Sequence, residues 1–481
     1  MISKRRTLWP ANASKFLYYK LFSFQKYVIS ILTLILSIII FRLYTYISYI
    51  PDRPRLDPDV WWGPNSTRDN QDTSVRPYRI LFPESVIKKF ELYRTSHKVK
   101  SFNGTSHSYG LNSDFLSEVF DFWRFKYNIR EREKYFNRYN HFLTNINGLD
   151  IHFVRFKPNV EKSVKVFPIL LLHGFPGSFK EFYEVIPTLT TKQNDYDFVF
   201  EVIVPSLPGF GYSQNPIKPG LSPLNIAIII HKLMERIGLD KYYIQGGDLG
   251  HLLGSYLTTL YPNNVLGFHT NTVINFNFNS FLVWFFGALF PGLIEKPYED
   301  KMYPLGDKLC NILEESGYLH MQATKPDTLG VAIQDSPLGL AAYIIEKYIT
   351  LSEPNSSLNS SLNAYSMVDL LDNVMVYWFT NTAMTSMRVH AEIFTDWDAM
   401  SFLWNRIPTN VPTWGLRTKH QLMHQPDFVL RWKYTKYFGS TYIDTGGHFP
   451  AMELPEILAK DVFKAVHQFD KYHLKLLKIN K

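Results

Sequence analysis

The sequence predicts an α/β protein in which helices cover both sides of a mostly parallel sheet. From Leu149 onward, short apolar runs typical of strands alternate with amphipathic stretches typical of helices. Between residues 275 and 405 this alternation stops and aromatic, helical sequence takes over, which indicates a helical cap inserted into the sheet domain. An apolar run near the N-terminus adds one expected membrane anchor helix.

The expected strands are short runs rich in β-branched and aromatic residues. They cover residues 151–156, 166–172, 198–204, 242–245, 265–270, 411–416 and 441–443. The clearest expected helix covers residues 226–237, because Ile226, Ile229, Leu233 and Ile237 recur on one face. Strands that alternate with helices form parallel sheets, and both faces of such sheets are buried.

Changes of pattern divide the chain into six expected parts. Residues before the sheet, around Trp123, are aromatic and charged, which suggests that they pack onto other parts of the chain. Within the cap, residues 352–361 are expected to form a short polar loop. The six parts are a basic segment (1–26), the anchor (27–50), a mostly helical region through about Phe142 (51–146), the sheet domain in two pieces (147–274 and 406–481) and the cap (275–405).

The apolar run over residues 27–50 is expected to cross a membrane once. About 20 helical residues span the hydrocarbon layer, and this run is long enough when Arg42 extends toward the interface. A cleaved signal peptide fits less well, because the preceding basic region is too long and no small-residue cleavage site follows. Basic residues before the run favour a cytoplasmic N-terminus. Glycosylation sequons carry little weight in an asparagine-rich chain; they occur at Asn12, Asn65, Asn103, Asn355 and Asn359.

Composition excludes several classes of function. The 481 residues carry a formal charge of +8 with Lys and Arg spread among acidic residues, so we expect no nucleic-acid partner. Cys310 is the single cysteine, which excludes an internal disulfide and a cysteine-based metal site. The sequence shows no metal-binding constellation and no nucleotide-binding loop, so we expect neither a cofactor nor a metal.

The most informative motif is the run GGDLG at residues 246–250, between an expected strand and a helix-like stretch. This pattern is typical of a nucleophile elbow, a sharp strand-to-helix turn that leaves one side chain exposed above a parallel sheet. The exposed side chain here is Asp248. A carboxylate attacks carbon directly and forms an ester with the enzyme. The motif therefore predicts alkyl transfer to water and excludes a serine-type esterase.

Two further glycine motifs complete the expected site. The run HGFPG at residues 173–177 follows a strand, and the backbone N–H of Phe175 can form an oxyanion hole with that of Leu249. The run GGHF at residues 446–449 places His448 near the C-terminus, which is the chain order of an α/β-hydrolase triad. We expect His448 to act as the general base that takes a proton from the attacking water.

These motifs resemble the microsomal epoxide hydrolases, the membrane-anchored family that includes juvenile hormone epoxide hydrolases. The resemblance covers almost the whole chain after the anchor and implies an α/β-hydrolase core with an N-terminal meander over residues 61–142 that wraps core and cap. It also implies that Tyr318, in the cap, is the acid over the departing epoxide oxygen. Further matching runs are WWGP (61–64), RP (76–77), YGLNS (109–113), NRY (137–139), GLDIHF (148–153), SGY (316–318), TKPDT (324–328) and DSPLGLAAY (335–343).

The same resemblance implies the substrate class and the location. The substrates would be lipophilic epoxides, which react with water to give vicinal diols. Arene oxides, fatty-acid epoxides and terpenoid hormones all suit an aromatic cavity, so detoxification and lipid or xenobiotic metabolism both stay open. The location would be the endoplasmic reticulum membrane, with one span and the catalytic body on the cytosolic side. That orientation conflicts with the one that the basic residues favour.

Three positions depart from the family pattern. The second cap tyrosine falls on His390, and the residue after the nucleophile, commonly Trp, is Leu249, which retains its backbone N–H. The triad acid falls on Gln421. A glutamine accepts a hydrogen bond from imidazole but cannot stabilise the charged ring. We therefore expect an ester on Asp248 that forms rapidly and is hydrolysed slowly.

These departures leave two hypotheses open. The first is an active epoxide hydrolase, and the second is a catalytically weakened relative that binds or sequesters lipids, which Gln421 and His390 favour. Another carboxylate could substitute for the missing acid, with Asp427 a better candidate by sequence distance than Asp444. A haloalkane dehalogenase would use an indole donor beside the nucleophile, where this chain has Leu249.

Overall fold

The computed structural model describes residues 11–479 except 54–55, 93–99, 276, 295, 353–364 and 396–403. The chain forms two compact units, Met1–Asp52 and Arg53–Lys481, and each is considered by itself. The expected polar loop at residues 352–361 lies almost entirely outside the described residues, as do the sequons at Asn355 and Asn359.

The first unit contains one long helix, α1 (Ala11–Ser48). Its stretch Phe24–Tyr46 is long and apolar enough to cross a membrane, and none of it is buried inside the protein. The stretch overlaps the expected anchor at 27–50 and ends earlier, because the helix itself ends at Ser48. By length and composition, this stretch is therefore a candidate for a membrane span among the described residues.

The second unit is built on a nine-stranded sheet with the order β1-β2-β3-β5-β4-β6-β7-β8-β9. The first three neighbouring pairs in this order, β1 with β2, β2 with β3 and β3 with β5, are antiparallel. The other five neighbouring pairs, from β5 with β4 to β8 with β9, are parallel. The predicted, mostly parallel sheet is therefore confirmed. The strands are β1 (Arg76–Tyr78), β2 (His141–Ile146), β3 (Leu149–Phe156), β4 (Lys165–Leu172), β5 (Phe198–Pro205), β6 (Tyr242–Gly246), β7 (Val265–Thr270), β8 (Thr413–Arg417) and β9 (Tyr437–Tyr442).

Helices bury both faces of this sheet. Along β6, Tyr242 and Ile244 pack into one apolar cluster and Tyr243 into another, because successive strand residues point to opposite faces. The first cluster includes α6 (Pro223–Arg236) and α7 (Leu249–Leu260), which pack against each other. The second cluster includes α5 (Ile186–Thr190) and α18 (Pro455–Ile479). The predicted helix at 226–237 corresponds to α6.

Two strands were not predicted, and one was predicted too late. The region through about Phe142 was expected to be mostly helical, but it contains β1 and the first part of β2. β2 and β3 form a hairpin whose turn residues, Asn147 and Gly148, both have positive φ angles of 51° and 87°. An Asn-Gly pair between two strands is the strongest local hairpin signal, so the sequence did contain the information. The strand expected at 441–443 is β9, which begins at Tyr437.

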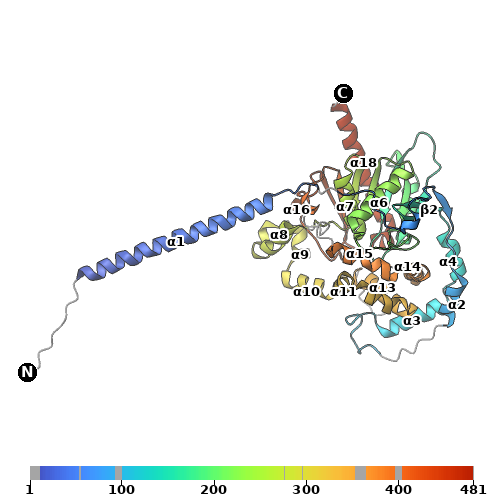
Figure 1. Cartoon of the computed structure of the whole chain (residues 1–481), viewed down its shortest axis with the longest axis horizontal. Helices are drawn as coiled ribbons and strands as arrows, with labels where there is room; N and C mark the ends of the chain where they lie inside the picture. The colour runs from blue at the N-terminus through green and yellow to red at the C-terminus, as the bar shows by residue number, and fades with distance from the viewer. Residues whose placement is uncertain are drawn as a thin grey trace, which may run out of the picture. The chain divides into compact units, whose positions relative to one another are not determined.

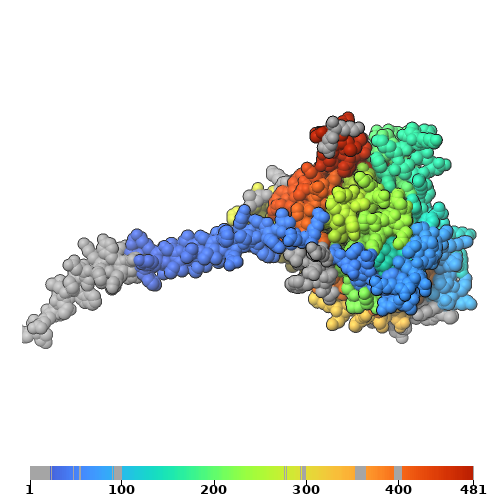
Figure 2. All heavy atoms as spheres, turned by 45° about the horizontal axis from the view of Figure 1, so that its top comes forward, coloured from blue at the N-terminus to red at the C-terminus, as the bar shows by residue number. Residues whose placement is uncertain are grey.

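The segment before the sheet contacts both the sheet domain and the cap. Lys232 of α6 donates to the carboxylate of Asp59 at 2.7 Å, and Tyr127 donates to Asp372 of the cap at 2.7 Å. Figure 2 shows this segment, in blue, on the surface of the body beside the green part that includes α6. Its helices are η1 (Asn65–Thr67), α2 (Glu84–Leu92), α3 (Ser113–Phe125) and α4 (Ile129–Phe136).

The cap consists of helices that fall within the expected range 275–405, and the domain limits themselves stay predictions. Figure 1 shows α10, α11, α13, α14 and α15 grouped together below α6 and α7. α12 packs on α15, and α13 packs on α14. The cap helices are α8 (Phe278–Leu289), η3 (Pro291–Leu293), α9 (Lys296–Met302), α10 (Leu305–Glu315), α11 (Gly317–Thr324), α12 (Pro326–Gln334), α13 (Pro337–Thr350), α14 (Met367–Thr380) and α15 (Ala383–Thr395).

Candidate active site

Asp248 lies at the tight turn between β6 and α7, as the sequence predicts. Its φ of 54° and ψ of −126° are unusual for a residue with a side chain, and such strained angles persist only where neighbours enforce them. The backbone N–H of Asp248 donates to Thr272 Oγ1 at 2.8 Å, which fixes the turn. The turn therefore holds the carboxylate at the carboxyl end of the parallel strands.

The two carboxylate oxygens of Asp248 have different partners. Oδ1 accepts from the backbone N–H of Leu249 at 2.7 Å and of Phe175 at 2.9 Å. A Cβ at Gly174 would stand 2.2 Å from Oδ1, so only glycine allows this close approach. Oδ2 lies 3.1 Å from His448 Nε2. One oxygen is thus held by two N–H groups, and the other faces the histidine.

Asp248 is set up to be ionised. Burial, the largest influence, would raise its pKa, but the hydrogen bond and charge of His448 and the Phe175 N–H together hold the pKa below its usual value. An ionised carboxylate is the form that can act as a nucleophile. The contacts of Oδ1 and Oδ2 therefore favour the ionised form of Asp248 against the effect of burial.

His448 connects Asp248 to Gln421. Its Nδ1 lies 2.8 Å from Gln421 Oε1, which also accepts from the N–H of Leu422 at 3.3 Å. Gln421 Nε2 donates to the carbonyl of Asn271 at 3.2 Å, so the amide is oriented with its oxygen toward the imidazole. Both ring nitrogens of His448 face oxygen atoms, and both are donors in the charged ring. Of the two side chains that face the ring, Asp248 is the one that can carry a charge, since Gln421 is neutral.

The loop that carries His448 is fixed on both sides of the histidine. The carboxylate of Glu453, in α17 (Pro450–Glu453), accepts from the N–H of Gly447 at 2.8 Å and of Phe449 at 2.9 Å. The N–H of His448 itself donates to the carbonyl of Leu351 at 2.8 Å. Backbone hydrogen bonds thus set the position of the imidazole.

The two carboxylates considered as substitutes for Gln421 lie elsewhere. Asp427, at the start of α16 (Asp427–Leu430), forms an ion pair with Arg417 at 3.0 Å. Asp444 is exposed. The group that faces Nδ1 of His448 is the Gln421 amide. The acid position of the site is therefore occupied by a neutral side chain.

Tyr318 of α11 and His390 of α15 meet over the HGFPG loop, residues 173–177, which is called the oxyanion loop below. The Tyr318 ring stacks on Phe175 with centroids 6.2 Å apart, and the His390 ring stands edge-on to Phe175 at 5.5 Å. The two cap rings are 6.4 Å from each other. Both predicted cap residues therefore lie beside the N–H group that holds Asp248.

Both cap residues are uncharged hydrogen-bond donors at neutral pH. Burial, and after it the charge of Asp248, raises the pKa of Tyr318 well above its usual value. Burial lowers the pKa of His390 to about 4, against a smaller opposite effect of Asp248. His390 is itself buried, and its Nδ1 has no hydrogen-bond partner among the described residues.

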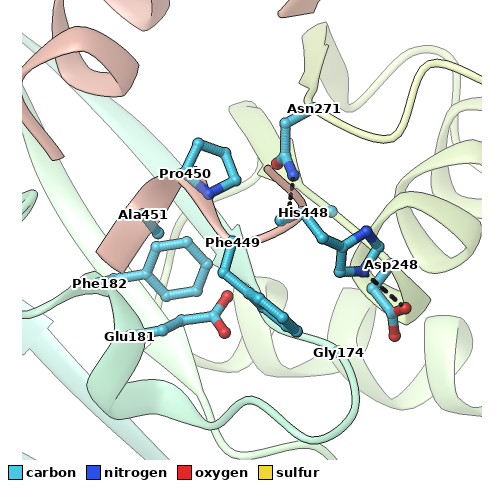
Figure 3. A pocket seen from close by; sticks show the side chains of 10 residues that line it. Gly174, Glu181, Phe182, Asp248, Asn271, His448, Phe449, Pro450 and Ala451 are labelled. Atoms are coloured by element: carbon cyan, nitrogen blue, oxygen red, sulfur yellow. Dashed lines mark hydrogen bonds and ion pairs between the residues drawn. The ribbon is translucent and has the colours of Figure 1, made fainter. Parts of the chain in front are cut away.

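The sequence prediction missed Glu181. This residue lies in one turn of 3-10 helix, η2 (Phe179–Phe182), that follows the oxyanion loop, and it lines a small cavity together with Asp248 and His448. Figure 3 shows the Glu181 carboxyl group pointing into the cavity from the Phe182 side. Its position eight residues after His173 could have drawn notice, but an acidic residue in a surface-like FKEF run gives no local signal of burial.

The fold and this arrangement define the class of the protein: an α/β hydrolase with a carboxylate at its elbow. Two family descriptions match the sequence, "Epoxide hydrolase N terminus" over residues 75–182 and "alpha/beta hydrolase fold" over residues 168–343.

Similar proteins narrow the class. The juvenile hormone epoxide hydrolase of Bombyx mori is 44% identical over 88% of this chain and 92% of the relative. Epoxide hydrolase 1 of Oryctolagus cuniculus is 36% identical over 90% of this chain and 98% of the relative. The crystal structure of the Bombyx mori enzyme superposes with a TM-score of 0.83 at 43% identity, covering 87% of this chain and all (100%) of the other. The chain therefore belongs to the epoxide hydrolase family and is a hydrolase, as the resemblance implied.

Proposed function

We propose that the protein converts lipophilic epoxides and water into vicinal diols through an ester on Asp248. The observation that carries the proposal is that the two carboxylate oxygens of Asp248 have different partners. Two N–H groups hold Oδ1, and Oδ2 faces His448. Two uncharged donors, Tyr318 and His390, lie above the same loop. A site with a nucleophile below and proton donors above suits the opening of a three-membered ether.

In the first half of the proposed reaction, Asp248 Oδ2 attacks an epoxide carbon and the carbon–oxygen bond of the ring breaks. The departing oxygen takes the proton of Tyr318, and the phenol recovers a proton from the charged ring of His448. The N–H of neutral His390 stabilises the developing alkoxide by a hydrogen bond, much as a second phenol would. The products of this half are a neutral hydroxyalkyl ester and a neutral His448.

In the second half, water attacks Cγ of Asp248 while His448 Nε2 takes one of its protons. The negative charge moves to Oδ1, where the N–H groups of Phe175 and Leu249 already point. The bond between Cγ and Oδ2 then breaks. Oδ2 leaves as an oxygen of the diol and takes the proton of the new carboxylic acid. Asp248 is then a carboxylate again, and its ion pair with His448 is restored.

Gln421 makes the second half the slower one in this proposal. The imidazolium that forms there no longer faces a carboxylate at Asp248, because the ester is neutral, and Gln421 offers only an amide oxygen. In the extreme case, the ester would persist and the protein would act as a lipid-binding or sequestering relative. An epoxide assay separates the two functions: the enzyme makes diol over many turnovers, and a sequestering protein stops after one equivalent.

We further propose that the protein is a single-pass protein of the endoplasmic reticulum membrane and takes substrates that dissolve in lipid. The apolar stretch Phe24–Tyr46 supports a membrane location. Detoxification and lipid metabolism are both compatible with this substrate class. The orientation is testable by glycosylation, because Asn12 and Asn65 lie on opposite sides of the apolar stretch.

The proposed function is tested with a panel of arene oxides, fatty-acid epoxides and terpenoid epoxides in detergent or vesicles. We expect diol formation from at least one class. Acid quenching during turnover should trap an adduct on the peptide that contains Asp248. Diol formation without any adduct, at a rate that survives Asp248→Asn, would refute the ester mechanism.

A further inference from the structure

The cavity beside Asp248 is the right size for one water molecule. It has a volume of about 20 Å³ and is lined by Gly174, Glu181, Asp248, Asn271 and His448, among others. A buried water needs roughly 10–15 Å³ of such space and two to four polar partners. The side chains of Glu181, Asp248 and His448 supply polar atoms on this lining. Figure 3 shows Asp248 and His448 at one end of the cavity and Glu181 at the other.

The carboxyl group of Glu181 lacks a protein partner within the part of the chain that the structure describes: no hydrogen bond or ion pair to its side chain is formed there. The residue is half-buried, so its carboxyl group is free to be hydrogen-bonded by water. Its position is nevertheless well defined, because Oε2 would lie 2.1 Å from a Cβ at Gly177. A glycine at this position of the oxyanion loop thus leaves room for the carboxyl group to lie across the backbone and face the cavity.

The cavity also adjoins the atoms of the hydrolytic step. His448 Nε2 must accept a proton from the water, and Asp248 Cγ must accept the hydroxyl oxygen. Both residues line the same cavity as Glu181. Glu181 and Asp248 are close enough for the charge of Asp248 to raise the pKa of the Glu181 carboxyl, although burial is the larger cause of that rise.

We propose that Glu181 binds the water that hydrolyses the Asp248 ester and provides the carboxylate that is missing at position 421. This inference rests on the proposed function and deepens it. One O–H of the water donates to the Glu181 carboxylate while the other proton passes to His448 Nε2. The water oxygen bonds to Cγ and the bond between Cγ and Oδ2 breaks. Glu181 neither gains nor loses a proton in this step; it orients the water and offsets the charge of the imidazolium.

Ester formation itself favours this role. The free carboxylate of Asp248 opposes ionisation of Glu181, whereas the ester is neutral. Alkylation therefore removes the smaller of the two causes that raise the pKa of Glu181, so the carboxylate form becomes less unfavourable at the stage where the water must be held, although the effect of burial stays. The water site is thereby coupled to the chemical state of the nucleophile.

The decisive variant is Glu181→Gln, with Glu184→Gln as the matched control. Glu184 lies three residues away and contacts Tyr135 and Arg138 instead of the cavity. Single-turnover mixing with styrene oxide, followed by acid quenching and mass analysis, gives the rates of ester formation and ester breakdown. We expect Glu181→Gln to slow breakdown about tenfold or more and to leave formation within about twofold of the unmodified protein. Glu184→Gln should leave both rates unchanged.

Unchanged breakdown in Glu181→Gln, or an equal loss in both steps, would overturn the proposal. Should Glu181→Gln fail to fold, Glu181→Asp keeps the charge but withdraws it by one methylene, and the same selective loss is expected. The unmodified protein offers an independent test, because a crystal structure should show a water between Glu181 and His448; a dry cavity would contradict the proposal. If the unmodified protein forms no ester at all, the proposed function fails instead, before Glu181 comes into question.

Discussion

The two sides of the site are built in different ways. On the sheet side, Asp248 and His448 have every polar atom of the reacting pair within 2.7–3.1 Å of a partner. On the cap side, Tyr318 and His390 are placed by ring contacts with Phe175, and Nδ1 of His390 has no described partner. The sheet side is thus preorganised without substrate, whereas the cap side retains donors for a substrate to use.

This difference explains where the chain departs from its family pattern. The nucleophile turn depends on backbone hydrogen bonds and close glycine contacts, which tolerate little change. The cap needs only an uncharged donor above Phe175, and neutral His390 meets that requirement as a tyrosine would. Leu249 and Gln421 are the exceptions on the sheet side. Leu249 still donates its backbone N–H to Asp248. Gln421 keeps the hydrogen bond to His448 and gives up the charge.

Asp248→Asn is the substitution that should abolish the contribution of the sheet side. The amide cannot form the ester, so we expect turnover to fall by about 10⁴-fold or more. Diol formation measured over hours gives the residual rate. Asp240→Asn controls for the loss of one carboxylate, because Asp240 precedes β6 and Asp248 follows the other end of that strand. Turnover within tenfold of the unmodified protein would show that the two sides have been assigned to the wrong chemistry.

Tyr318→Phe should remove the principal donor of the cap side. Loss of the phenol leaves the departing oxygen without its proton source, so we expect ester formation to slow by about 10²–10³-fold. Ester breakdown should change much less, because water and His448 act from the sheet side. Single-turnover kinetics separate the two steps. A selective effect on breakdown instead would reverse the roles of the two sides.

Gln421→Glu should accelerate the step that depends on the sheet side of the site, the breakdown of the ester. A carboxylate facing Nδ1 stabilises the imidazolium, so we expect ester breakdown to accelerate between about tenfold and a hundredfold. The gain is limited because Gln421 Nε2 now donates to the carbonyl of Asn271, and a second carboxylate oxygen would oppose that carbonyl. The same step measured in the Glu181→Gln background should show a larger gain. Equal gains in both backgrounds would mean that Glu181 does not replace the missing acid.

His390→Phe should have the smallest effect, and it has a signature in stability. Since burial holds the pKa of His390 at about 4 against 6.5 in an unfolded chain, only the unfolded state binds its proton between these values. His390 therefore lowers stability as the pH falls from 6.5 toward 4. We expect the unfolding free energy of the variant to fall by about 1.6 kcal/mol less than that of the unmodified protein between pH 6.5 and 5 in urea unfolding. An identical pH dependence would contradict a neutral His390.

The same variant should slow ester formation by about tenfold, the value of one hydrogen bond. His390→Tyr should restore that rate, because a phenol is the other uncharged donor that fits the position. Failure of the tyrosine to restore it would indicate that His390 fills space over Phe175 rather than donating.

The elements of the site that the sequence predicted are those with local signals. The run around Asp248 and the loop around His448 were predictable because glycines flank each of these side chains. Their order along the chain is typical of an α/β hydrolase, which predicts that the two side chains lie in one site. The parallel strands other than β9 were also predictable, because each contains a short apolar run. The hairpin of β2 and β3 was also predictable, because Asn147 and Gly148 form a typical hairpin turn. This turn signal is stronger than the helical signal of the charged residues that precede the hairpin.

Glu181 could not be read in the same way. Its place in the cavity depends on the close approach of its carboxyl group to Gly177 and on Phe449, which comes from a segment more than 250 residues further along the chain. No pattern within the FKEF run predicts these contacts. The pairing of Arg417 with Asp427 was likewise set by tertiary packing, and sequence distance alone made Asp427 look like a candidate.

The most direct test of the central claim is a single turnover in water labelled with ¹⁸O. If Asp248 forms the ester, the diol of the first turnover takes its new oxygen from the carboxylate and contains no label, and the label enters the Asp248 peptide. Diol that carries ¹⁸O from the first turnover, with an unlabelled peptide, would show that water attacks the epoxide directly and would contradict the account.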